Sequence, residues 1–356
     1  MKFLHLDASG RGVILALCVA NGAVTDAILV RNLYCSLPSR KLRSADMIGP
    51  LLVLAAALFW GTDALVRTPA LAMATATTIV FAEHALGFLL ITPFVMLRRG
   101  SAFLVLPQRA WLPALFVGAG GSALATVLFT ASFRDINPTV AILIQKLQPL
   151  FVVGVAYRAL GERPRPGFYR WAMAALVAAT LLSVPEWAAG SADGISHRPL
   201  RGLLLATVAA TLWGGATVLG KKLLRQVPSE VATWWRYAVG LATMTAIVAV
   251  HGRNLGGVGQ AMAFTLSHGE ELLPLVLVAG AVPMTLYYAG LKRTPASVAT
   301  FIELVYPLSS AVLNAVFLGR GLSAPQVVAG AVLLLAIHQI SHEPTKTAVE
   351  FSPARS

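Results

Sequence analysis

Two apolar stretches of the chain share one pattern, and together they constrain the fold more than any other feature. The first, AILIQKLQPL, contains Gln145 and Pro149, and the second, ATFIELVYPL, contains Glu303 and Pro307 at the matching positions. Proline has no N–H and clashes with the carbonyl group four residues earlier, so each helix is predicted to kink there. In lipid, an opened backbone is tolerated only where it faces protein or a wet cavity. The pattern therefore predicts two matched broken helices, with the carbonyls of Gln145 and Glu303 lacking helical partners.

The composition is that of a membrane protein. Hydrophobic residues make up 57% of the chain and charged residues 12%, and the mean hydropathy is +0.73. Several apolar runs reach the roughly 20 residues that a helix needs to cross a bilayer core of about 30 Å. The net charge of +13 comes from Lys and Arg residues placed between these runs, without a basic stripe interleaved with aromatics, so no nucleic-acid partner is expected. Cys18 and Cys35 suggest neither a disulfide framework nor a metal site, and no metal or cofactor is expected.

Ten apolar spans can be read along the chain. We therefore expect an all-α integral membrane protein with ten transmembrane helices. The spans cover residues 48–66, 75–97, 110–131, 138–157, 167–184, 202–219, 231–250, 272–290, 295–318 and 324–341.

The first five spans resemble the second five. AALFWGTDALV, which contains Trp60, is echoed by AATLWGGATVL, which contains Trp213. Because five is an odd number, two tandem copies must cross the membrane in opposite orientations. This arrangement is typical of secondary transporters, whose binding site lies near the midplane between the copies. The expected domains are therefore two inverted five-helix repeats, at 48–184 and 202–341, followed by a cytoplasmic tail at 342–356.

Residues 1–46 lie outside the repeats. They contain an apolar run at 12–30 that fits a signal-like segment, an extra membrane helix, or upstream sequence translated from a start that is too early. Met47 stands just before the first strong span, and we favour the early start because no later part of the chain needs this segment.

The positive charges indicate an orientation. Seventeen Lys and Arg residues fall in the segments on one side of the expected topology and six in the loops on the other. The six are Arg67, Arg134, Arg198, Arg201, Arg253 and Arg320. Cytoplasmic loops carry the excess of positive residues, so both ends of the core are expected in the cytoplasm of a multi-pass plasma (inner) membrane protein.

With these features the sequence resembles the drug/metabolite transporter superfamily, in the form of two tandem EamA-type domains. The resemblance rests on the Trp-Gly of each first span, the apolar runs into Pro149 and Pro307, and Leu-Gly-Glu ending at Glu162. It covers about residues 48–341 and implies a ten-helix inner-membrane carrier of metabolites or amphipathic compounds, often an exporter. The second half departs from the pattern at Arg320, where the family has an acidic residue.

Four ionisable residues lie deep in the expected spans, where charges are costly and commonly mark a substrate or ion pathway. We expect Glu83 with Lys146, and Arg236 with Glu303, to face a central cavity and bind a polar substrate. The alternative is two buried ion pairs that only fix helix register. Glu303 is our candidate for the carboxylate that contacts substrate or a coupling proton.

Other polar and aromatic residues take second place. Gln145, Gln148 and Tyr306 are expected to contact substrate or to bridge helices. His84 is expected to be a satisfied core histidine, and Asp63 an interfacial residue. Trp60, Trp213 and the small-residue clusters are expected to serve helix packing.

Three classes of function fit a bundle of this kind. The expected one is a secondary active transporter, an exporter or exchanger of a small metabolite or amphipathic compound, working by alternating access. A membrane-embedded enzyme acting on lipid or a lipid-linked substrate is less favoured, because the sequence has no His-Glu-x-x-His, Gly-x-Ser-x-Gly or Gly-x-x-x-x-Gly-Lys-Ser/Thr motif. A passive channel or scramblase is the third. The expected partners are a small-molecule substrate, the lipid bilayer and a proton as coupling ion, with a homodimer left open.

Overall fold

The computed structural model describes residues 44–136, 138–190, 199–251, 257–317, 322–342 and 346–347. The chain divides into two units, Met1–Asp46 and Met47–Ser356, and the second unit forms the helical bundle. The expectations for the run at 12–30 and for Arg320 lie outside the described residues.

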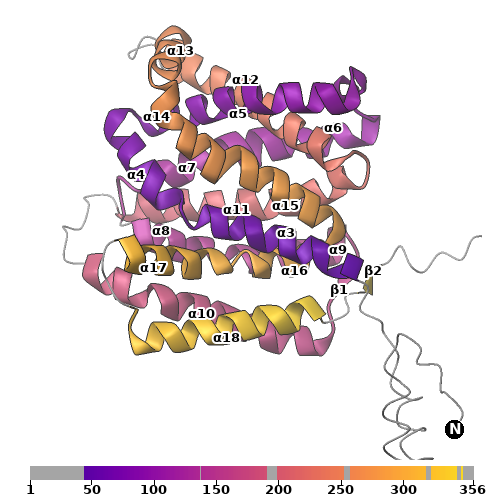
Figure 1. Cartoon of the computed structure of the whole chain (residues 1–356), viewed down its shortest axis with the longest axis vertical. Helices are drawn as coiled ribbons and strands as arrows, with labels where there is room; N and C mark the ends of the chain where they lie inside the picture. Colours follow the sequence, from indigo (N-terminus) through magenta and orange to yellow (C-terminus); the bar gives the residue numbers. More distant parts are fainter. Residues whose placement is uncertain are drawn as a thin grey trace, which may run out of the picture. The chain divides into compact units, whose positions relative to one another are not determined.

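Helices make up nearly all of the described chain (Figure 1). The first half contains α3 (Ser44–Trp60), α4 (Asp63–Met73), α5 (Ala76–Arg99), η1 (Ala102–Leu104), η2 (Gln108–Ala110), α6 (Trp111–Leu115), η3 (Phe116–Leu124), α7 (Ala125–Ser132), α8 (Pro138–Gln145), α9 (Gln148–Ala159) and α10 (Pro166–Gly190). The second half contains α11 (Pro199–Leu224), α12 (Ser229–His251), α13 (Gly257–Ser267), α14 (Gly269–Pro274), η5 (Leu275–Ala281), α15 (Val282–Arg293), α16 (Ala296–Ile302), α17 (Val305–Phe317) and α18 (Ala324–His342). Two short strands, β1 (Glu162–Arg163) and β2 (Lys346–Thr347), pair antiparallel.

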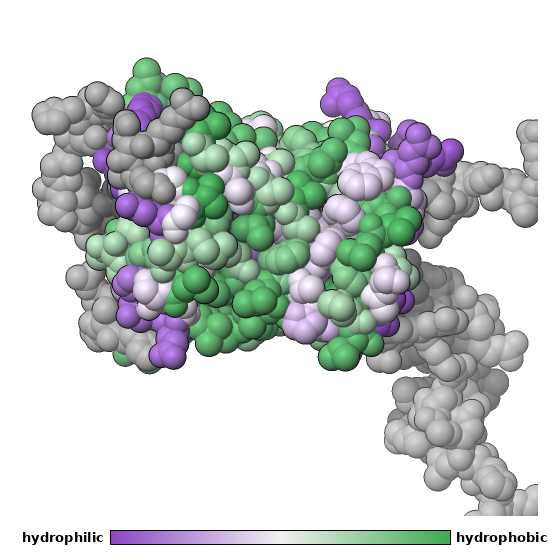
Figure 2. All heavy atoms as spheres, turned by 90° about the horizontal axis from the view of Figure 1, so that it is seen from above, coloured by the Kyte–Doolittle hydropathy of each residue, from purple (hydrophilic) through white to green (hydrophobic). Residues whose placement is uncertain are grey.

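Eight helical segments in the described part are long and apolar enough to cross a membrane. They are Met47–Met73, Ala76–Arg99, Gln108–Ser132, Val140–Ala159, Pro199–Leu224, Gly269–Arg293, Ala296–Leu313 and Ala324–His342. The helices α10 and α12 occupy the fifth and seventh expected spans and have 25 and 23 residues, but they are not among the eight. Figure 2 shows apolar residues across the middle of the visible face and hydrophilic residues at two opposite ends. This is the surface pattern of a multi-pass membrane protein.

Local sequence signals begin and end helix α5. The Thr75 side chain accepts a hydrogen bond from the Thr78 N–H at 3.2 Å and so caps the first turn. Arg98 and Arg99 lie in the last turn, where positive charge complements the helix dipole. Gly100 follows with a φ of 57°, a conformation that glycine adopts without a Cβ penalty, and its N–H bonds to the Met96 carbonyl.

The second helices of the two halves, α5 and α12, pack against each other in opposite directions. Arg99 at the end of α5 forms an ion pair with Glu230 at the start of α12. Further along, the Trp234 indole N–H donates to the Thr92 hydroxyl at 3.0 Å. A Cβ on Gly240 would lie 2.4 Å from the His84 ring, so the two helices touch closely there as well. Two equivalent helices therefore run antiparallel, as an inverted repeat requires.

The third helix of each half contains a π-helical stretch, η3 in the first half and η5 in the second. π-helical turns are rare and occur frequently at functional sites. Neither stretch was predicted from the sequence. Before this third helix of the second half, α13 lies in the segment between the seventh and eighth expected spans.

At one edge of the bundle, α10 packs along α18, and the two helices lie side by side at the lower edge of Figure 1. Elsewhere the halves interlock. Gly290 of α15 lies so close to α3 that a Cβ there would be 2.7 Å from the Gly49 carbonyl oxygen. Small residues thus bring the first helix of one half against the third helix of the other.

Candidate functional site

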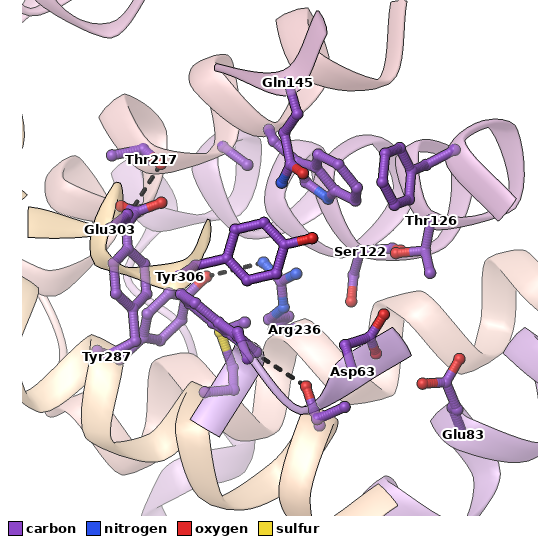
Figure 3. Close-up of a pocket in the computed structure, with 18 of the residues that line it drawn as sticks. Asp63, Glu83, Ser122, Thr126, Gln145, Thr217, Arg236, Tyr287, Glu303 and Tyr306 are labelled. Carbon is purple, nitrogen blue, oxygen red and sulfur yellow. Dashed lines mark hydrogen bonds between the residues drawn. The ribbon is translucent and has the colours of Figure 1, made fainter. Parts of the chain in front are cut away.

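A cavity of about 210 Å³ lies inside the bundle and is lined by residues of both halves. Six of the seven predicted contact residues line it, and Lys146 does not. The six are Glu83, Gln145, Gln148, Arg236, Glu303 and Tyr306. Figure 3 shows Arg236 between Tyr306 and Asp63, with Glu303 and Tyr287 toward one end of the view and Glu83 toward the other. The tertiary structure therefore gathers side chains from the second, fourth, seventh and ninth expected spans around one space.

The predicted pairing of Glu83 with Lys146 is wrong. Glu83 instead accepts two hydrogen bonds from the Arg67 guanidinium, both at 2.9 Å. Arg67 also binds Asp63, one helical turn earlier in α4, at 2.8–3.1 Å. Arg67 was expected in an external loop and Asp63 at the interface, whereas α4 continues through both residues. The spacing of four between Asp63 and Arg67 was the sequence signal that could have revealed this ion-pair cluster.

Lys146 is buried away from the main cavity. Its ammonium group donates a hydrogen bond to the Ala179 carbonyl of α10. It lines a smaller neighbouring cavity of about 40 Å³. Lys146 occupies the break between α8 and α9, and this turn directs its side chain toward α10 rather than toward Glu83.

Glu303 is partly buried among neutral hydrogen-bond donors. The Tyr287 hydroxyl donates to its Oε1 at 2.7 Å, and the Gln148 amide donates to its Oε2 at 3.4 Å. Since the Tyr287 proton is engaged, Thr217, whose hydroxyl oxygen lies 3.1 Å from that of Tyr287, is the donor of that bond. The predicted ion pair with Arg236 is not among the four salt bridges of the described residues, so that pairing is wrong too.

Arg236 enters the cavity from α12. Its two terminal nitrogens lie 3.4 Å from the Tyr288 hydroxyl and 3.4 Å from the Gly121 carbonyl of η3. Its guanidinium carbon is 6.0 Å from the centre of the Tyr288 ring. These are long contacts for a charged donor.

The two prolines follow helix breaks, as predicted, but the backbone there is bonded differently from the prediction. The helix is interrupted at Lys146–Leu147 before Pro149, and at Glu303–Leu304 before Pro307. The Glu303 carbonyl was expected to lack a partner, yet it accepts the Tyr306 N–H at 3.0 Å. Tight three-residue turns thus take up backbone groups that the proline leaves open.

His84 and two tryptophans also line the cavity. His84 donates from Nδ1 to the Val80 carbonyl at 2.8 Å, so its neutral ring accepts from Ser122 at Nε2. It is therefore the satisfied core histidine expected from the sequence. Trp60 donates to the Ala279 carbonyl of η5 and lies 5.3 Å from the Tyr287 ring centre. The ring centres of Trp213 and Phe129 are 5.0 Å apart. Both tryptophans therefore pack as expected, and they also form part of the cavity wall, which was not predicted from the sequence.

At one end of the bundle, two charged side chains form hydrogen bonds between helices. The buried Glu162 carboxylate accepts the N–H groups of Ala296 and Ser297 at 2.8 and 2.9 Å and the Ser297 hydroxyl at 2.6 Å. Lys221 donates to three carbonyls at the end of α15, at 2.6–3.1 Å. Glu162 belongs to the first half and α16 to the second, so this carboxylate joins the two halves at the end where Arg99 also meets Glu230.

A family model described as the EamA-like transporter family matches residues 47–184 and again residues 200–341. The chain belongs to the EamA-like transporter family. It is a multi-pass membrane transporter with two tandem copies of the family unit, as the resemblance predicted.

Named relatives agree with this assignment. The protein named "Riboflavin transporter ImpX" of Fusobacterium nucleatum subsp. nucleatum is 30% identical over 307 residues, which cover 82% of this chain and 97% of that protein. "Uncharacterized transporter YwfM" of Bacillus subtilis is 25% identical over 306 residues, or 83% of this chain and 94% of the relative. A solved crystal structure with 20% identity superposes with a TM-score of 0.64 and covers 82% of this EamA-like chain and 96% of its own, a likeness of fold alone.

Proposed function

We propose that the protein is a secondary active carrier, with ten transmembrane helices in two inverted five-helix repeats, that exchanges a small organic solute by alternating access. One observation carries the proposal: both halves line a single polar and aromatic cavity inside an apolar bundle. Transporters built from inverted repeats place their site between the repeats and rock one against the other. The antiparallel course of α5 and α12 supports that geometry.

We propose a flavin as the solute, with riboflavin as the first compound to test. Support comes from the name of the 30% identical relative and from the cavity wall. Aromatic side chains surround the space, and flat rings stack on such surfaces. The aromatic lining consists of Trp60, Phe129, Trp213, Tyr237, Tyr287, Tyr288 and Tyr306. Hydroxyl and amide groups of Ser122, Thr126, Gln145 and Gln148 offer partners for a polyhydroxyl chain.

The proposed orientation places the end that carries Arg98, Arg99, Lys221 and Arg293 in the cytoplasm of the plasma membrane, in line with the excess of positive residues there. The Glu162 and Lys221 contacts lie at that end, so they would hold the cytoplasmic side closed in this conformation.

Reconstituted protein in liposomes tests this function. Vesicles loaded with unlabelled riboflavin should take up labelled riboflavin by counterflow, with saturation and with competition by related flavins. Uptake that never saturates and shows no counterflow would favour the channel or scramblase. Chemical conversion of a lipid or of riboflavin in the same vesicles would favour the enzyme.

Glu303 is the proposed coupling carboxylate. Its hydrogen-bond partners are neutral, and no described Lys or Arg forms a salt bridge with it, so a proton can be taken up or released there without breaking an ion pair. Glu303→Gln should preserve folding and counterflow but abolish riboflavin accumulation driven by a pH gradient. Normal gradient-driven uptake by Glu303→Gln would exclude Glu303 as the coupling group and leave the carrier assignment intact.

A further inference from the structure

The cavity contains two arginines in contrasting environments. Arg67 forms five hydrogen bonds to the carboxylates of Asp63 and Glu83, at 2.8–3.1 Å. Arg236 forms none of the salt bridges of the described chain and has two contacts, both at 3.4 Å, for its five N–H donors. A guanidinium inside a membrane bundle is stable only with partners that replace water. Arg236 is therefore a cation whose protein partners leave most of its donors available.

The position of Arg236 suits a ligand. Its side chain comes from α12 and, in Figure 3, lies in the middle of the drawn residues, with Tyr306 and Gln145 on one side and Asp63 on another. The planar guanidinium presents two parallel N–H donors and binds paired oxygen acceptors in a fixed geometry. Aromatic rings line the same space, so a flat solute could lie against them while its edge meets the guanidinium.

The charges that line the cavity favour an uncharged pair of solute oxygens, such as carbonyls, over a carboxylate or phosphate. Three carboxylates, from Asp63, Glu83 and Glu303, line the space together with two guanidinium groups, from Arg67 and Arg236. When all are ionised, the three carboxylates outnumber the two guanidinium groups, and a proton on Glu303, the proposed coupling group, brings the lining to neutral but not to positive. A solute carboxylate or phosphate would add negative charge in a region where water does not screen it well. Uncharged carbonyl oxygens can accept from Arg236 without that repulsion.

We propose that Arg236 recognises an uncharged carbonyl-bearing edge of a planar heteroaromatic solute and so orients the ring against the aromatic wall. This inference rests on the proposed carrier function and specifies the chemistry of its site. In a flavin, the matching edge is the carbonyl-bearing pyrimidine part of the ring system, whereas the sugar-alcohol chain is attached to a nitrogen of the central ring. Recognition therefore depends on the ring, and the charge of the lining disfavours solutes that carry a phosphate group.

Flavin fluorescence quenching with purified protein tests the inference with three probes: riboflavin, lumichrome and riboflavin 5′-phosphate. Lumichrome keeps the carbonyl edge but lacks the sugar-alcohol chain. A charged hydrogen-bond donor contributes about 1.5–3 kcal/mol, so Arg236→Met should weaken the binding of riboflavin and lumichrome by roughly 10- to 150-fold. Arg236→Lys keeps the charge but not the paired donors and should lose an intermediate amount. The parent should bind the phosphate ester at least tenfold more weakly than riboflavin.

The control is Arg170→Met, which removes an exposed arginine of α10 and should leave all three affinities unchanged. Thermal unfolding checks that Arg236→Met is folded. If the parent binds riboflavin and this folded variant binds it equally well, the role of Arg236 in recognition is refuted and the flavin assignment stands. If the parent binds lumichrome but not riboflavin, and Arg236→Met loses that binding, riboflavin is not the solute and the role of Arg236 in recognising the ring edge stands. Binding of the phosphate ester as tight as that of riboflavin refutes the preference for an uncharged edge. A folded parent that binds none of these probes refutes both proposals.

Discussion

Removing the Arg67 side chain should destabilise the protein more than removing either carboxylate that it binds. Arg67 joins α4 to α5, and its side chain is 8% exposed, against 11% for Glu83 and 23% for Asp63. In Arg67→Met a chain of similar length replaces the guanidinium, so the main change is electrostatic. Two neighbouring carboxylates then lose their shared cation inside the bundle.

The expected magnitude follows from the burial of the cluster. Breaking a buried ion pair from one side costs about 3–5 kcal/mol, because a charge is left uncompensated. Glu83→Gln keeps the contacts between Arg67 and Asp63, so its cost should be about 1–3 kcal/mol, the cost of leaving buried groups incompletely bonded. Domains of about 150–250 residues lose roughly 2–4 °C of melting temperature per kcal/mol, and Arg67→Met should therefore melt on the order of 6–20 °C below the parent.

Thermal unfolding in detergent, followed by tryptophan fluorescence, measures the effect. The double variant Arg67→Met with Glu83→Gln should melt above Arg67→Met alone, because one of the two uncompensated charges is gone. Adding Asp63→Asn should raise the melting temperature further. Arg170→Met serves as the exposed-arginine control. An Arg67→Met protein that melts within 1 °C of the parent, or a triple variant less stable than Arg67→Met, would refute the electrostatic reasoning.

Three further predictions concern contacts between the two halves of the bundle and the N-terminal residues of the chain. Glu162→Gln replaces a carboxylate that accepts three hydrogen bonds at the start of α16, so it should lower the melting temperature. It should also make a cysteine introduced at Ser297 react faster with a thiol reagent. Unchanged reactivity would argue against a role of Glu162 in closing the cytoplasmic side. Gly290→Ala places a Cβ 2.7 Å from the Gly49 carbonyl, so it should destabilise the fold by about 1–3 kcal/mol in the same unfolding assay, and a neutral effect would contradict this close approach. A chain that begins at Met47 should insert in membranes and transport like the full chain, as membrane fractionation and uptake will show; loss of insertion would reveal a membrane helix or signal within residues 1–46.

Much of the architecture could be predicted from the sequence, because a bilayer limits what a chain can do. Apolar runs of membrane-spanning length require helices, and the doubled motifs around Pro149 and Pro307 indicate two related halves with matched breaks. Intramembrane polar residues have few tolerable places, and for this reason Glu83, Gln145, Arg236 and Glu303 could be assigned to one cavity before its geometry was known.

Pairing between charges was decided by the tertiary structure. The sequence suggested one ion pair within each half, but side-chain direction at a helix break depends on a few backbone dihedrals that no pattern of residue types records. The turn after Gln145 directs Lys146 toward α10, and the continuation of α4 brings Arg67 to Glu83. The result is a compensated arginine and an available one, Arg236, in the same cavity. The apolar runs of the sequence thus indicated most of the residues that lie inside the bundle. The packing of the two halves determined which of those charges are paired within the protein and which remain available in the cavity.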